Sequence, residues 1–156
     1  MAVKASLSIS DEDDVLRIRD LAERFRAAIE ACDLRRLPIT FQEFPRGSCG
    51  DATLVLAKYL KENEQEGFVY VCGMRDGHSH AWLERNGLIV DITGDQFPDN
   101  DDPVCVSRGS AWHAQFEIDR EDPSDIDLYD DFTRFNLGAA YDRISQHLLV
   151  QGDVSR

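Results

Sequence analysis

The sequence predicts an α+β fold, in which a buried central helix packs on an antiparallel β-sheet between flanking N- and C-terminal helices. Residues 52–60 are almost entirely apolar, as in a helix that is buried on all sides. Residues 78–93 alternate around an Asn86-Gly87 pair, which is typical of a hairpin with a two-residue turn. Apolar residues recur at helical spacing over about residues 10–33 and 133–149.

The central helix is expected to carry a cysteine at its start. In residues 44–60, a loop containing Gly47 leads into the helix at Cys49. Unpaired N–H groups and the positive end of the helix dipole favour ionisation of a thiol in this position. The same N–H groups could hold an oxyanion after the thiolate attacks a carbonyl. A buried structural cysteine is the alternative that this stretch alone leaves open.

Composition indicates one domain over residues 1–156 and limits its partners. The chain has 17 basic and 30 acidic residues, a net charge of −13, with 42% hydrophobic and 9% aromatic residues. Such a charge repels nucleic acid and anionic membranes, so we expect neither as a partner. A peptide or protein substrate, basic in character, fits better. The oligomeric state is not predicted.

The four cysteines predict reduced thiols rather than a metal site. They are widely spaced, without a C-x-x-C pair or clustered histidines, so neither a structural metal nor another cofactor is expected. Residues 1–8 lack the apolar run of a signal peptide, and no stretch is long enough to cross a bilayer. These features predict a cytoplasmic protein.

The remaining segments are assigned from composition. Residues 39–45, between two prolines, are expected to be extended, and residues 68–72 to form a buried strand. Residues 94–131 form an acidic segment with a short strand at 104–106 and a second strand candidate at 111–118, where His113 is expected to have no catalytic role. Because eight of the fifteen residues in 117–131 are acidic, that part is expected to be solvated and mobile, with gating of the site or attraction of a basic substrate as the alternative.

The hairpin register places a histidine beside a carboxylate. A two-residue turn at Asn86-Gly87 pairs Arg85 with Leu88 and brings Asp91 diagonally next to His80. A three-residue loop would instead move Asp91 to the opposite face. One face then carries His78, His80, Trp82, Ile89, Asp91 and Thr93, and the other the apolar Ala81, Leu83, Leu88, Val90 and Ile92.

These two stretches together supply the residues of a nucleophilic site. Cys49 is the candidate nucleophile, His80 the base and acid, and Asp91 the group that orients the imidazole. An aspartate in an apolar strand needs a partner, and the register offers His80. Because His78 lies on the same face, the sequence leaves open which histidine is the base.

The motifs resemble the core of the transglutaminase-like superfamily, which has a papain-like fold. The resemblance rests on Gly47-Ser48-Cys49-Gly50 at a helix start, on His80-Ala81-Trp82-Leu83-Glu84, and on Asp91-Ile92-Thr93. It covers about residues 44–97 and implies the triad Cys49, His80 and Asp91, with Trp82 as the aromatic after the histidine. The segment 46–49 is also similar to arylamine N-acetyltransferases, members of the wider papain-like group.

A cysteine-dependent amide hydrolase, a thiol protease or glutamine deamidase, is the function that we expect. The alternatives are acyl transfer to an amine, as by a transglutaminase, and an acidic binding module that keeps the fold without catalysis. Candidates for holding the oxyanion or the substrate are Gln42, Ser48, Gly50, His78, Trp82 and Gln96.

Overall fold

The computed structural model describes residues 9–154 and has an α+β fold with three α-helices and a five-stranded antiparallel sheet. The strand order is β4-β3-β2-β1-β5. Among the helices of residues 9–154, none combines the length and apolar character that a bilayer span requires. The elements are α1 (Ile9–Ala31), α2 (Cys49–Glu62), β1 (Val69–Arg75), β2 (His78–Arg85), β3 (Leu88–Asp91), β4 (Cys105–Arg108), β5 (Glu117–Pro123) and α3 (Asp131–Val154).

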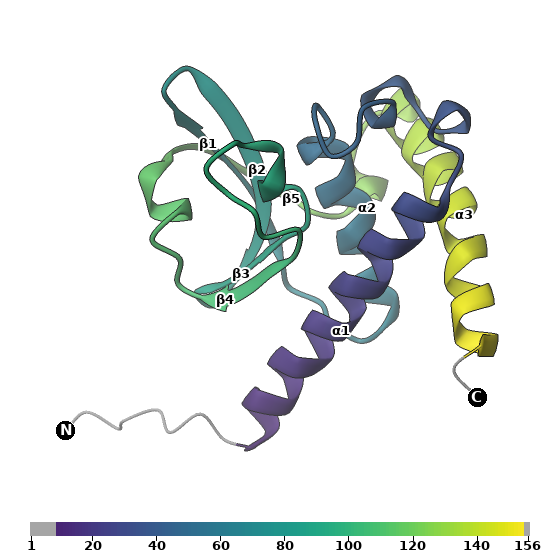
Figure 1. Ribbon diagram of the computed structural model, residues 1–156, viewed down its shortest axis with the longest axis horizontal. Coiled ribbons are helices and arrows are strands. Elements are labelled where there is room, and N and C mark those ends of the chain that lie inside the picture. Colours follow the sequence, from purple (N-terminus) through teal and green to yellow (C-terminus); the bar gives the residue numbers. More distant parts are fainter. Residues whose placement is uncertain (1–8, 155–156) are drawn as a thin grey trace.

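The central helix α2 lies between the sheet and the other two helices (Figure 1). It packs on β2, while α1 and α3 contact its other sides and each other. This position explains its apolar sequence, because its buried residues include Ala52, Val55 and Leu60. The predicted buried helix is therefore confirmed, and its first residue, Cys49, is held at the edge of the main core.

The hairpin has the predicted register. Arg85 pairs with Leu88 and Leu83 with Val90, around a turn in which Asn86 and Gly87 both have positive φ. The two faces also separate as predicted. Ala81, Leu83, Leu88, Val90 and Ile92 join the main core against the helices, and Trp82 and Ile89 join a second, aromatic cluster with Val71 and Phe116.

The segment before α2 is not extended as predicted. Ile39–Phe41 forms a 3-10 turn, and Phe41 is buried in the main core. Helix α1 already ends at Ala31 and α2 begins at Cys49, and the backbone after Pro38 turns because the Phe41 N–H bonds to the Pro38 carbonyl. The predicted strand at 68–72 and the helices at 10–33 and 133–149 are confirmed, with ends displaced by a few residues.

The acidic segment is more ordered than its composition predicts. The short strand at 104–106 is confirmed as part of β4, but residues 111–118 are not one strand, because His113–Gln115 forms a 3-10 turn. Glu117–Pro123 is solvated as predicted, but it forms a regular strand, β5, which pairs with β1 at the edge of the sheet. Because almost all of its residues are exposed, β5 has the charged composition of a loop.

Replacing Gly87 by alanine should destabilise the protein, whereas the same change at Gly138 should not. Neither position has an atom within 4 Å of an added Cβ, so only the backbone differs. Gly87 has φ +81°, which costs an L-residue roughly 1–2 kcal/mol. Gly138 lies within α3, where alanine gains up to about 1 kcal/mol. Urea unfolding of both variants should give opposite shifts in midpoint, and equal shifts would contradict this account of the turn.

Candidate active site

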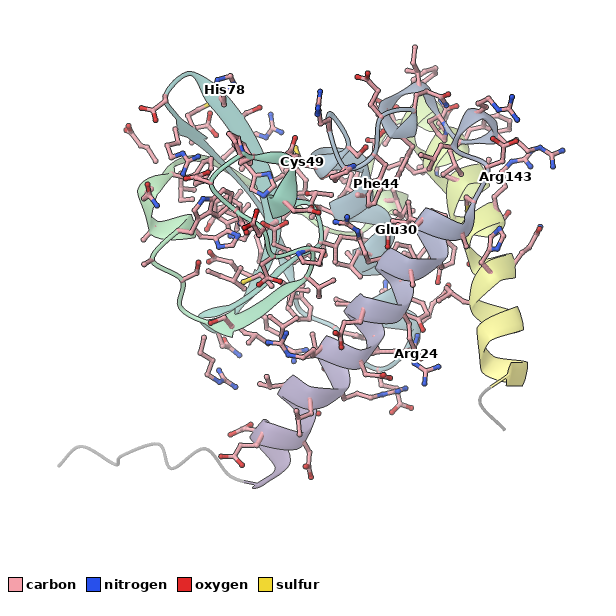
Figure 2. All side chains as sticks on the ribbon, viewed as in Figure 1. Arg24, Glu30, Phe44, Cys49, His78 and Arg143 are labelled. Atoms are coloured by element: carbon pink, nitrogen blue, oxygen red, sulfur yellow. The ribbon has the colours of Figure 1, made fainter. Side chains whose placement is uncertain are left out.

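Cys49 is the first residue of α2, at the end of the helix that faces the sheet and the loop after β3 (Figure 2). Its thiol is partly buried, and the His80 side chain, the backbone N–H of Ala81 and the Gln96 side chain lie close enough to lower its pKa. The N–H groups of the first helical turn have no acceptor within the helix. The nucleophile candidate therefore faces both an imidazole and a set of hydrogen-bond donors.

The loop before Cys49 is held by side chains that the sequence suggested for substrate binding. Gln42 donates from its amide nitrogen to the carbonyls of Leu34 at 2.6 Å and Leu37 at 2.9 Å, so it does not face the thiol. Ser48 is fully buried and donates from its hydroxyl to the Thr40 carbonyl at 2.6 Å. The side chains of Gln42 and Ser48 are thus both engaged by backbone carbonyls of the preceding segment.

His80 lies in β2 beyond the last residue that pairs with β3, so its ring reaches past the end of that strand. Its Nε2 is 2.7 Å from Oδ2 of Asp91, and its Nδ1 is 3.2 Å from the Gln96 amide nitrogen and faces Cys49. Aromatic rings surround the fully buried imidazole at centroid distances of 5.2 to 5.8 Å. They belong to Trp82, Phe97, Trp112 and Phe116.

Asp91 ends β3 as a buried carboxylate with four hydrogen-bond donors. Oδ1 accepts from the Thr93 backbone N–H at 2.9 Å and from its hydroxyl at 3.4 Å. Oδ2 accepts from His80 and also from Nε2 of His113, each at 2.7 Å. Burial raises the pKa of this carboxyl, but the charge of His80 and the hydrogen bonds of both imidazoles outweigh it and hold the pKa well below the ordinary value.

His113 belongs to this site, although no catalytic role was expected for it from its sequence context. It follows β4 in a 3-10 turn, and Ser110 Oγ lies 2.7 Å from its Nδ1. Its distance of 22 residues from Asp91 gives no periodic signal. The available signal was local. Ser110 lies three residues before His113, and the aromatic residues Trp112 and Phe116 are close in the sequence. This pattern is typical of a buried turn in which a serine hydroxyl pairs with a histidine ring.

The loop after β3 is fixed by a buried arginine from α1. Arg26 donates to the Ile92 carbonyl at 2.7 Å and forms a paired contact with both carboxylate oxygens of Asp95, at 2.7 and 2.9 Å. Gly94 permits close packing here, because an added Cβ would lie 2.8 Å from the Asn100 amide and 3.0 Å from Asp91 Oδ2. These contacts hold Gln96 beside the thiol.

The electrostatics favour a thiolate–imidazolium pair. Burial raises the pKa of Cys49, but the hydrogen bond and charge of His80, with the donors of Ala81 and Gln96, bring the pKa below its ordinary value. Burial lowers the pKa of His80, but the charge and hydrogen bond of Asp91, with the contact to Cys49, raise the pKa to about 9. Each partner therefore stabilises the charged form of the other.

The other candidates have different positions. His78 is exposed at the outer tip of the β1–β2 hairpin, away from Cys49, so the geometry favours His80 as the base (Figure 2). Trp82 is buried and packs edge-on against His113, with its Nε1 donating to Glu84 at 2.9 Å, so it supports the imidazoles. Gly50 lies in the first turn of α2, where an added Cβ would be 3.2 Å from the Tyr70 hydroxyl.

Two surface hollows share the lining residues Arg46, Gln96, Phe97 and Pro98, of which Gln96 also lies beside the thiol. The first, of about 850 Å³, extends over Glu43 and Asp101. The second, of about 650 Å³, extends along the β1–β2 turn to His78. A further hollow of about 410 Å³ lies at the opposite end of α2, near Lys61 and Asp125, and is remote from Cys49.

The two histidines and Asp91 are also the donor types that bind metals, with one atom of each within 4.8 Å of the others. Their geometry fits hydrogen bonding, because each Nε2 is 2.7 Å from the same carboxylate oxygen. An ion coordinated by all three would have to displace both N–H hydrogens.

Comparison of the chain with family models, with curated proteins and with solved structures gives no match. The functional conclusions below therefore rest on the geometry of the site and on the chemistry of its residues.

Iodoacetamide should label Cys49 at a lower pH than the other three cysteines. The pKa of Cys49 is lowered, whereas burial raises the pKa of Cys32 and Cys72 and brings the pKa of Cys105 to about 11. Because only the thiolate reacts, peptide mapping after labelling at neutral pH should find the label on Cys49. His80→Ala should abolish this selectivity, and His78→Ala should preserve it. Equal labelling of Cys49 and Cys32 in the native protein would contradict the ion pair.

Proposed function

We propose that the protein is a cysteine-dependent amide hydrolase that acts on a peptide or protein through a thioester intermediate. The observation that carries the proposal is the series Cys49, His80 and Asp91, in which a thiol at a helix N-terminus faces an imidazole that is hydrogen-bonded to a buried carboxylate. A buried structural cysteine would need neither the imidazole nor the donors around it. Membership of the transglutaminase-like superfamily, with its papain-like core, is part of the same proposal.

In the first step, the Cys49 thiolate attacks the amide carbon and a carbon–sulfur bond forms. The carbonyl oxygen becomes an oxyanion, which in this proposal accepts hydrogen bonds from the Gln96 amide, near the thiol, and from the backbone N–H of Cys49 at the helix start. The His80 imidazolium then gives its Nδ1 proton to the amide nitrogen. The carbon–nitrogen bond breaks, the amine leaves, and the acyl group stays on the sulfur.

In the second step, water attacks the thioester while neutral His80 accepts one of its protons at Nδ1. The carbon–sulfur bond breaks, a carboxylic acid is released, and the thiolate–imidazolium pair is restored. If an amine takes the place of water, the product is a new amide. Acyl transfer is therefore the alternative outcome of the same chemistry.

The surface around the thiol favours an extended substrate. The two hollows share Gln96 and Phe97, so an extended chain that follows both would pass over Gln96, the neighbour of Cys49. One hollow carries the exposed carboxylates of Glu43 and Asp101, and the net charge is −13. A basic segment on that side of the scissile amide fits this surface.

The decisive experiment is to trap the acyl-enzyme. Incubation of the protein with a library of peptides, followed by rapid acid quenching and mass spectrometry, should find acyl groups on Cys49, with none on Cys49→Ala. Release of the free acid identifies a hydrolase, and product that requires an added amine identifies an acyltransferase. Native protein that labels rapidly with iodoacetamide but forms no acyl adduct with any peptide would contradict the proposal, and a binding module would then be favoured.

Gln96→Ala should lower kcat/KM by about 10²–10³-fold, since it removes one donor to the oxyanion. Gln42→Ala is the matched control, because its amide is bound to backbone carbonyls away from the thiol. That variant should lower the unfolding midpoint with less than a tenfold effect on kcat/KM. The reverse pattern in steady-state assays would assign the oxyanion donor to Gln42.

Hydrolysis should decrease as the pH rises through about 9, where His80 loses the proton that the leaving amine requires. The same titration affects stability. Because the pKa of His80 rises from 6.5 to about 9 on folding, the stabilisation is complete below about 6.5 and is lost as the pH passes 9. Both kcat/KM and the urea midpoint of unfolding should therefore decrease as the pH rises through about 9. In His80→Asn, the urea midpoint should no longer decrease over this pH range.

A further inference from the structure

A second imidazole shares the carboxylate that orients His80. The Nε2 atoms of His80 and His113 each lie 2.7 Å from Oδ2 of Asp91, and all three side chains are at most 3% exposed. The other carboxylate oxygen is held by Thr93. Hydrogen bonds to both carboxylate oxygens therefore fix the orientation of the Asp91 side chain.

The hydrogen positions follow from the chemistry of the acceptor. An ionised carboxylate only accepts hydrogen bonds, so both Nε2 atoms must carry a hydrogen. Ser110 Oγ accepts from the His113 backbone N–H at 3.2 Å and lies 2.7 Å from Nδ1. Its hydroxyl hydrogen is free to point at Nδ1, and this keeps the His113 hydrogen on Nε2. The donor order is thus Ser110 to His113 to Asp91, with His80 donating to Asp91 from the other side.

We propose that His113 is a positioning residue of the active site, which aims Asp91 at His80, and that Ser110 sets the tautomer in which it does so. The inference rests on the proposed function only in taking Cys49 as the reacting thiol. His113 does not touch Cys49 or the substrate hollows. It acts through Asp91, by fixing the orientation of the oxygen that holds the His80 imidazolium.

Other groups near this series could also affect its titration. Cys105 of β4 lies near Asp91, and Tyr70 and Cys72 of β1 lie near Cys49. Arg75 covers the outer side of the Phe97, Trp112 and Phe116 rings and is paired with Asp99. Their contributions are the same in the variants below, so differences between the variants report on His113.

The test measures iodoacetamide labelling of Cys49 against pH, which requires no substrate. His113→Phe removes the donor but keeps an aromatic ring, and it should raise the midpoint of the labelling profile by about one pH unit, so that labelling below the midpoint becomes about tenfold slower. His113→Gln retains an N–H close to the place of Nε2 and should recover most of the native rate. Ser110→Ala leaves the imidazole but removes the group that sets its tautomer, so its rate should be intermediate.

Melting temperatures of all three variants separate positioning from folding. A fall in melting temperature without a shift in the labelling midpoint would mean that His113 has only a structural role, and would overturn the proposal. If His113→Phe does not fold, Ser110→Ala decides the question in the same way. Loss of native labelling selectivity on chelation with EDTA would also overturn it, since His113 would then be a metal ligand.

If the midpoint shifts but no peptide is ever cleaved, the amide hydrolase proposal fails while the positioning role of His113 stands. If peptides are cleaved but the midpoint of the labelling profile is the same in the native protein, His113→Gln and His113→Phe, the amide hydrolase proposal stands and the positioning role of His113 fails. The two proposals therefore have separate outcomes.

Discussion

The ionised carboxylate of Asp91 is the constraint on which the site depends. Asp91 is almost fully buried, and a buried charge is tolerated only when hydrogen-bonding or charged partners compensate for the lost hydration. Four donors do so here, from β2, from the chain just after β3 and from the turn after β4. Removing Asp91 would leave two buried imidazoles without their acceptor. The same interaction thus orders three segments of chain and charges the imidazole that faces Cys49.

Local signals were sufficient to predict the elements that carry Cys49, His80 and Asp91. The Asn86-Gly87 turn fixed the register of β2 and β3, because both turn residues take positive φ. Alternation then assigned the two faces correctly, since only one of them is uniformly apolar. The apolar sequence of α2 reflects burial between a sheet and two helices. Patterns of this kind depend on neighbours within a few residues, and the sequence records them directly.

Interactions between distant segments left weaker signals. Gln42 and Gln96 are both glutamines in polar segments, and only the fold shows that the first binds backbone carbonyls while the second faces the thiol. His113 reaches Asp91 because β4 returns alongside β3 and the chain then turns inward. Strand β5 was not recognised from the sequence because it is an edge strand, paired with β1 alone, and its residues are charged and exposed.

The six residues from Asp91 to Gln96 combine most of what the site requires in one short stretch. Asp91 supplies the carboxylate, and Thr93 supplies two of its hydrogen-bond donors. Gly94 occupies a position where a side chain would collide, Asp95 binds Arg26, and Gln96 places its amide beside the sulfur. Such density makes D-x-T-G-D-Q a compact fingerprint. Together with Cys49 upstream and the Ser110-x-x-His113 sequence downstream, this hexapeptide contains every side chain of the hydrogen-bonded site around Asp91 except His80.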